Sequence, residues 1–186
     1  AERQERFATR EKPLRQYECV TLFAHDRPYL EHGGVLRVAG APECDLYFLN
    51  LGWRQHDAVV AFTNGDTEFA LGYALRRQAL VLQFDPRVCH AVGLHINLAA
   101  ALQRTIKDEF GLDESELGLA IDAHPAMAGE AGSDSDWVLF YDAIASGNVP
   151  LAQLADHFLD LVERAHTRML TCVGNGDQPC RQGCYM

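Results

Sequence analysis

Three cysteines near the end of the chain have the residue type and the spacing of a metal site. Cys172, Cys180 and Cys184 all fall within the last fifteen residues. Closely spaced thiolates can hold one tetrahedral zinc ion, and glycine gives the backbone the freedom that such tight turns need. We therefore expect a structural zinc knuckle here, and its competing interpretation is a tail of free or oxidised cysteines, although a disulfide is disfavoured in an intracellular protein. The glycines of this stretch are Gly174, Gly176 and Gly183.

The fourth ligand of this zinc site is the open question. The sequence starts at Ala1 and stops at Met186, two residues after Cys184. We expect a truncated knuckle in a fragment of a larger protein, with the fourth thiolate at the next position. His166 lies shortly before Cys172 and could supply the fourth ligand instead. A surface histidine is the competing interpretation.

The other three cysteines are isolated in apolar stretches. Cys19, Cys44 and Cys89 have no neighbouring ligand at metal-site spacing. We expect each of them to be a small buried hydrophobic residue.

Candidate catalytic residues are scattered along the chain. No GxSxG, HExxH, Walker loop or dinucleotide fingerprint is present. Asp142 ends a predicted strand that leads through a polar turn into a helix, which is a place where ligands often meet sheets. A cap or turn hydrogen bond is the alternative role for Asp142, and the same alternative holds for Asp85 before Pro86. A hydrolase or nuclease that uses Asp142 with a histidine stays an alternative, with His90, His95 and His124 as the candidates.

The charge distribution excludes a uniformly basic nucleic-acid surface. The net charge is −10, and residues 107–142 hold ten acidic residues and one base. Phosphate binding draws on clustered Lys and Arg. The first sixteen residues carry a weak basic cluster, which we interpret as a solvated arm, with a phosphate contact as the alternative: Arg3, Arg6, Arg10, Lys12 and Arg15.

The pattern along the chain predicts an α+β fold. Apolar, β-branched runs predict strands at 17–24, 35–39, 45–50, 58–63, 79–84, 117–122 and 137–142, separated by turns such as Gly40-Ala41-Pro42. Apolar residues at helical spacing predict one amphipathic helix over 91–110, ended by Gly111, and a second that starts near Pro150 and leads into Cys172. We expect a mixed sheet, two long amphipathic helices and a C-terminal cysteine knuckle. The predicted domains are a polar arm (1–16), a core (17–171) and the truncated knuckle (172–186).

No apolar run is long enough to cross a membrane, and no signal peptide is apparent. We therefore expect a cytoplasmic protein that does not bind membranes.

Four segments, in order, resemble the zinc-binding domain found at the C-terminus of MrfA-type DNA helicases and in DrmB, the helicase partner of DISARM anti-phage systems. They are residues 46–52, residues 76–84, residues 138–143 with 146–148, and the helix that runs into Cys172, Cys180 and Cys184. The sequence differs from the family at Arg77 and Gln78, where a Thr-Asp pair is usual, and in the longer gap between Cys172 and Cys180. These differences favour the DrmB-like branch.

The resemblance implies a non-catalytic accessory domain that binds structural zinc. Its partner would be a DNA helicase subunit or domain, and it would contact DNA through the full-length assembly. The biological setting would be anti-phage defence or DNA repair. A protein-interaction module that acts independently of nucleic acid is the alternative in another functional class.

Overall fold

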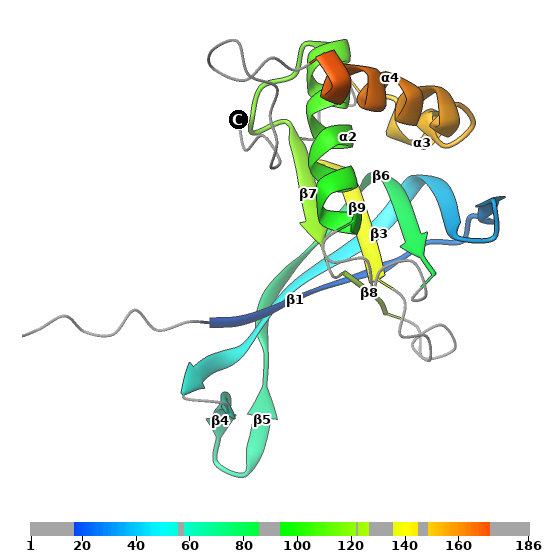
Figure 1. Cartoon of the computed structure of the whole chain (residues 1–186). Helices are drawn as coiled ribbons and strands as arrows, with labels where there is room; N and C mark the ends of the chain where they lie inside the picture. Colours follow the sequence, from blue (N-terminus) through cyan, green and yellow to red (C-terminus); the bar gives the residue numbers. More distant parts are fainter. Residues whose placement is uncertain are drawn as a thin grey trace, which may run out of the picture. The chain divides into compact units, whose positions relative to one another are not determined.

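The structure is a computed structural model of the chain, and it describes residues 17–55, 58–85, 94–121, 123–126, 136–144 and 149–171. Figure 1 shows the strands and helices in the order in which they follow along the chain. They are β1 (Tyr17–Ala24), β2 (Leu30–His32), β3 (Leu36–Gln55), β4 (Ala58–Asn64), β5 (Thr67–Phe69), β6 (Leu71–Phe84), α2 (Leu94–Phe110), β7 (Leu117–Ile121), β8 (His124–Pro125), β9 (Asp136–Asp142), α3 (Leu151–Leu154) and α4 (Phe158–Thr171).

The chain divides into two compact units, and the boundaries fall inside strands. Unit 1 comprises Ala1–Val20 and Phe48–Tyr73, and unit 2 comprises Thr21–Tyr47 and Ala74–Met186. Strand β3 therefore begins in unit 2 and ends in unit 1, and β6 makes the reverse passage.

The sheet of unit 2 is mostly antiparallel. Strands β3, β6, β9 and β7 follow one another in the sheet. Leu80 pairs with Phe140 between β6 and β9, and Leu119 pairs with the same residue from β7. Strands β1 and β8 form a parallel pair through Leu22 and His124. The predicted α+β class and mixed sheet are confirmed.

One face of this sheet is covered by the three helices. Leu80 and Leu82 of β6 and Val138 and Phe140 of β9 alternate toward this face, as the two-residue period of a strand requires. They pack in one cluster with side chains from all three helices, and Figure 1 shows α2 lying across β7 and β9, with α4 beside α2. The helical members are Ala99, Leu102, Ile106, Leu151, Leu154, Phe158, Leu161 and Ala165.

The second face of the sheet is also buried. Val81, Trp137 and Leu139, which alternate with the helix-facing residues, are at most 3% exposed. Phe23 of β1 lies against Trp137 with ring centroids 5.3 Å apart. Unit 2 therefore has apolar packing on both sides of its central strands.

The predicted turn at Gly40-Ala41-Pro42 is wrong, because β3 runs through it without a break. Gly40 serves a close approach instead of a turn. A Cβ atom at this position would lie 1.9 Å from the backbone oxygen of Ala152. Glycine is therefore required here by a contact with α3 that is distant in the sequence.

The second predicted helix is divided into two. Between α3 and α4 the backbone makes tight i to i+3 hydrogen bonds, from the N–H of Asp156 to the oxygen of Gln153 and from that of His157 to Leu154. Ala155 and Phe158 on either side of this turn are both buried. The apolar stripe thus continues across the break, so the prediction of two long helices is only partly confirmed.

Candidate functional site

Helix α4 positions the predicted zinc knuckle, and it is fixed to α2 along most of its length. Phe158, Leu161 and Ala165 are at most 1% exposed. On its polar side, Arg164 Nε lies 3.2 Å from Glu109 Oε2, and an Arg168 guanidinium nitrogen contacts Asp108. The helix thus delivers the chain to Cys172 from an anchored position.

The predicted zinc ligands Cys172, Cys180 and Cys184 lie outside the described residues. Among the residues that the structure does describe, no group of three or more His, Cys, Asp or Glu side chains could hold a metal ion. His166 is exposed on α4, as a surface histidine would be. The last turn of α4 exposes Met169 (56%) and Leu170 (73%). The zinc site therefore stays a prediction, carried by the donor set of three thiols.

The remaining cysteines differ from one another. Cys44 is fully buried, and burial raises the pKa of its thiol to about 12. A thiol with such a pKa stays protonated at neutral pH, which fits the predicted role of Cys44 as a small buried hydrophobic residue. The prediction that Cys19 is buried is wrong, because it is exposed near the start of β1, before the strand reaches the packed Phe23. Cys89 lies outside the described residues.

The catalytic candidates are not brought together in the described part of the chain. Asp142 is buried at the end of β9, on the face that the helices cover. The His95 Nδ1 atom lies 3.6 Å from Asp136 Oδ2, at the other end of the same strand. A strand of this length separates the two ends by about 20 Å. His95 therefore cannot act together with Asp142 as one catalytic pair.

The other candidates have structural positions. The Asp85 backbone N–H donates to the oxygen of Val35 at 2.9 Å, which ties the end of β6 to a segment distant in the sequence. Its turn role before Pro86 stays a prediction, because Pro86 lies outside the described residues. His124 is exposed on β8, where it pairs with Leu22 of β1. His90 lies outside the described residues. The described geometry assembles no hydrolytic site.

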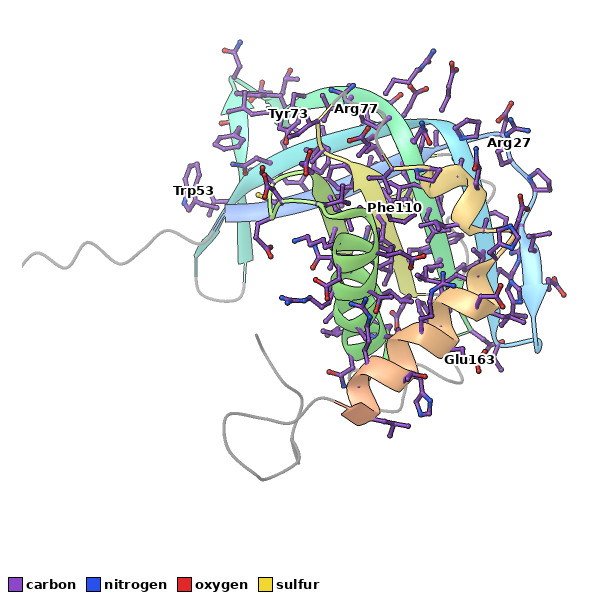
Figure 2. The ribbon with its side chains drawn as sticks, turned by 90° about the horizontal axis from the view of Figure 1, so that it is seen from above. Arg27, Trp53, Tyr73, Arg77, Phe110 and Glu163 are labelled. Atoms are coloured by element: carbon purple, nitrogen blue, oxygen red, sulfur yellow. The ribbon has the colours of Figure 1, made fainter. Side chains whose placement is uncertain are left out.

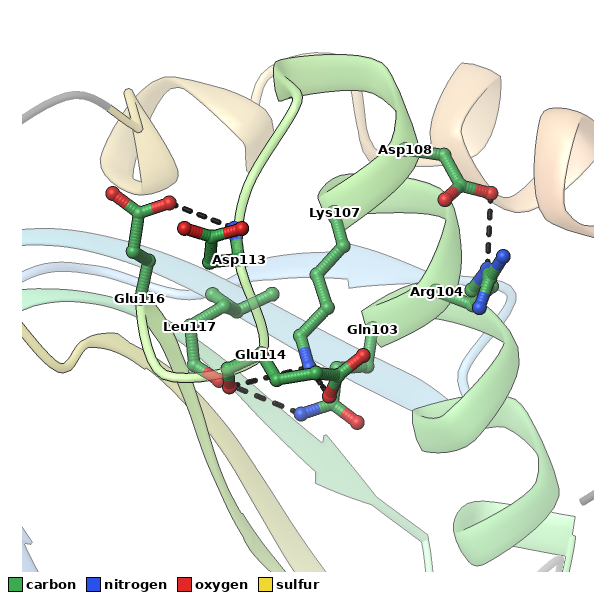
Figure 3. A network of polar contacts seen from close by, with 8 residues as sticks. All are labelled: Gln103, Arg104, Lys107, Asp108, Asp113, Glu114, Glu116 and Leu117. Carbon is green, nitrogen blue, oxygen red and sulfur yellow. Dashed lines mark hydrogen bonds and ion pairs between the residues drawn. The ribbon is translucent and has the colours of Figure 1, made fainter. Parts of the chain in front are cut away.

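A polar network holds α2 against the turn that precedes β7 (Figure 3). The Lys107 side chain is 7% exposed, and its ammonium group donates to Glu114 Oε2 at 2.5 Å. This contact holds the pKa of the Glu114 carboxyl below its usual range. The Asp113 backbone N–H donates to Glu116 Oε2 at 2.7 Å, which is one half of a capping box. These contacts tie the end of α2 to the start of β7, which is a structural role.

Two contacts between side chains were not predicted from the sequence. The partner of His95 is one, because Asp136 comes from a strand distant in the sequence. The other is a trio of aromatic rings in unit 1, Trp53, Phe62 and Phe69. Phe62 lies 5.9 Å from Trp53 and 5.8 Å from Phe69 between ring centroids. The signal that could have revealed the trio is the apolar spacing on both sides of the Gly65-Asp66 turn.

Comparison with known proteins supports the resemblance seen in the sequence. A family model described as the MrfA Zn-binding domain matches residues 98–186, a stretch that starts inside α2 and includes all three terminal cysteines. The crystal structure of the DUF1998 helicase MrfA bound to DNA is similar to this chain, with a TM-score of 0.57 and 13% identity. The match covers 91% of this chain and 22% of the helicase chain. No curated protein matches the sequence.

The structural match shows a shared fold, and the chain spans about a fifth of the length of that helicase. The predicted resemblance to the MrfA zinc-binding domain is confirmed by the family match and by the fold. The DrmB-like branch stays a prediction. Among the described residues, no helix is long and apolar enough to cross a membrane.

Proposed function

We propose that the chain is a non-catalytic zinc-binding accessory domain of a DNA helicase or of a helicase partner subunit. The observation that carries this proposal is the position of the cysteine donor set. Cys172, Cys180 and Cys184 fall within the residues matched by the family of zinc-binding domains, directly after a helix anchored to the core. Thiolates are the ligands that structural zinc sites favour.

Zinc would act here as a cross-link and not as a reagent. A site closed by protein ligands leaves no position for a reactive water. Three cysteines would hold the metal together with a fourth ligand, for which His166 is the described candidate. Because metal binding stabilises the folded segment, the free energy of binding becomes free energy of folding.

Zinc content per chain tests this proposal. We expect about one zinc per chain by elemental analysis, and loss of most of it in Cys180→Ser, because removing one thiolate opens the site. The same variant, or treatment with a chelator, should lower the melting temperature. The matched control is Cys19→Ser, which removes an exposed free thiol and should keep the metal. A native chain without zinc, or a Cys180→Ser variant that melts like the native protein, would contradict the proposal.

The proposed setting is the cytoplasm, in anti-phage defence of the DISARM type, with the chain as part of a DrmB-like subunit, or in DNA repair. The differences from the family at Arg77 and Gln78 support the DrmB-like branch. DNA would be contacted through the full-length assembly, because this chain carries a net charge of −10. Deletion of the gene should increase phage plaquing in the first setting and sensitivity to DNA-damaging agents in the second.

A further inference from the structure

The aromatic trio in unit 1 forms a continuous surface on a small sheet. Trp53 of β3 pairs directly with Val60 of β4, so their side chains share a face. Phe62 is two residues further along β4, and it pairs with Phe69 of β5. The ring contacts confirm that all three aromatic side chains lie on one face. Figure 2 shows the Trp53 side chain extending from the end of β3.

This aromatic face is partly open to solvent, because Trp53 and Phe62 are half-buried and Phe69 is exposed. Phe69 is 40% exposed, and the residues of β5 are exposed along the whole strand. Among the described side chains between Phe48 and Tyr73, no apolar one is fully buried. Exposed aromatic rings in contact with one another are typical of surfaces that bind a partner.

The neighbouring backbone suits an extended partner. Strand β5 is the last strand in the sheet order, so among the described strands its outer edge has no neighbour. An extended polypeptide segment can add to such an edge while its alternate side chains cover the face beside it.

The charges decide which kind of partner fits. The charged side chains described between Phe48 and Tyr73 are Asp66 and Glu68, both exposed and both acidic. In the sequence, residues 48–73 hold three carboxylates and one arginine. Nucleic-acid phosphates would be repelled, although bare aromatic rings can stack on bases. A segment with Lys or Arg beside its apolar residues would be attracted.

We propose that the aromatic face of Trp53, Phe62 and Phe69, with the edge of β5, is a docking surface for an extended protein segment in which basic and apolar residues alternate. This surface lies outside the residues matched by the zinc-binding family, which begin at residue 98. The proposal therefore goes beyond the proposed function and does not depend on zinc.

A pair of synthetic peptides tests the proposal on the full chain. The probe is the acetylated and amidated peptide Lys-Val-Lys-Phe-Lys-Val-Lys, and its control has Glu in place of every Lys. Tryptophan fluorescence reports binding at Trp53, because the second tryptophan, Trp137, is 3% exposed in the core of unit 2. We expect the basic peptide to bind about tenfold more tightly than the acidic one, with a preference that weakens as salt rises.

Matched variants locate the binding site. Phe69→Thr removes an exposed ring of the trio while keeping a residue suited to strands, and should weaken binding of the basic peptide about tenfold. The control Tyr73→Thr removes an exposed ring that stacks on Phe48, outside the trio, and should leave binding unchanged. Asp66→Asn with Glu68→Gln should abolish the preference for the basic peptide. Cys180→Ser should bind it normally, which separates this test from that of the zinc site.

Several outcomes would overturn the proposal. They are no binding of either peptide, equal binding of both, or a Phe69→Thr variant that binds like the native chain. Single-stranded oligothymidine is a third probe, and we expect it not to bind. If it binds, and Phe69→Thr abolishes that binding, the face would be reassigned to nucleic acid. A dimer of the native chain that Phe69→Thr dissociates would reassign it to self-association.

Discussion

Lys107 shows how a single buried charge fixes a local structure. Its side chain is 7% exposed, whereas that of its partner Glu114 is 88% exposed. The lysine gives up most of its hydration, so the carboxylate and the backbone oxygen of Glu114 must replace it. Burial of one partner distinguishes this pair from Arg76 and Asp45, whose side chains are 65% and 35% exposed.

We predict that Glu114→Gln lowers the melting temperature at pH 7, because it leaves the Lys107 ammonium without its carboxylate. The hydrogen bond from Lys107 lowers the pKa of Glu114 from its ordinary 4.5. The folded state thus favours the ionised form, and this stabilisation is complete above pH 4.5 and is lost as the pH falls through the lower folded pKa. The difference in melting temperature between variant and native chain should therefore shrink in acid.

Asp45→Asn is the control for this prediction. It removes a carboxylate whose pKa is also lowered, by Arg76, but in an exposed pair that water screens. Thermal melts followed by circular dichroism at pH 7 and pH 3.5 measure both variants. A larger effect of Asp45→Asn than of Glu114→Gln would contradict the role assigned to burial.

At the scale of the element, helix α4 packs in the core and directly precedes the cysteine segment in the sequence. Leu161 is fully buried on its inner side, and Leu159, two residues earlier, is 62% exposed. The two leucines have the same chemistry and almost the same place along the chain. Replacing each leucine by alanine therefore distinguishes the contribution of core packing to stability from that of helix propensity.

We predict that Leu161→Ala destabilises the protein by about 2–5 kcal/mol, because it leaves a cavity in the buried cluster that α4 shares with α2 and the strands. Leu159→Ala should change the free energy of unfolding by less than about 0.5 kcal/mol. Urea unfolding followed by circular dichroism measures both. Equal effects of the two substitutions would show that α4 does not depend on this packing.

The long periodic elements could be predicted from the sequence, and the reason is local. Strand β1 covers the predicted residues 17–24. Gly111 follows the last residue of α2 with a φ of 63°, the left-handed backbone conformation that commonly ends an α-helix. The break between α3 and α4 could not be predicted, because the apolar stripe passes through it. Strands β2, β5 and β8 have two or three residues each, too few to show a period.

The candidate functional residues also include some that the sequence predicts and some that only the tertiary structure reveals. The cysteine cluster is a property of the sequence, so residue type and spacing were sufficient to identify it. The aromatic trio is a property of pairing, because its members come from three strands and meet only through the registers of β3 with β4 and β4 with β5. The requirement for glycine at Gly40 is equally non-local, since Ala152 lies more than a hundred residues later.

At the scale of the whole molecule, burial is distributed unevenly between the two units. Ala79, Val81 and Leu82 of β6 are fully buried, as are Val138 and Phe140 of β9. Between Phe48 and Tyr73, none of the described hydrophobic side chains reaches that level. Local stability follows buried apolar contact, so the two units should open with different free energies.

We predict that backbone amides of β4 and β5 exchange with deuterium roughly 100-fold faster than those of β6 residues 79–84 and of β9, because local opening of unit 1 exposes little apolar surface. Hydrogen exchange followed by mass spectrometry on proteolytic peptides measures this ratio. Equal protection across the four strands would mean that both units unfold as one cooperative body.

The passage of β3 and β6 between the units has a consequence for how such a protein can diversify. Phe48 and Tyr73, the first and last residues of this stretch of unit 1, stack with ring centroids 5.0 Å apart, so the two ends of the stretch are adjacent. An excursion with adjacent ends can be lengthened, exchanged or reduced to an Asn-Gly hairpin turn without altering the register of the remaining sheet. The core of unit 2 can thus stay unchanged while the stretch between residues 48 and 73 varies in length and sequence.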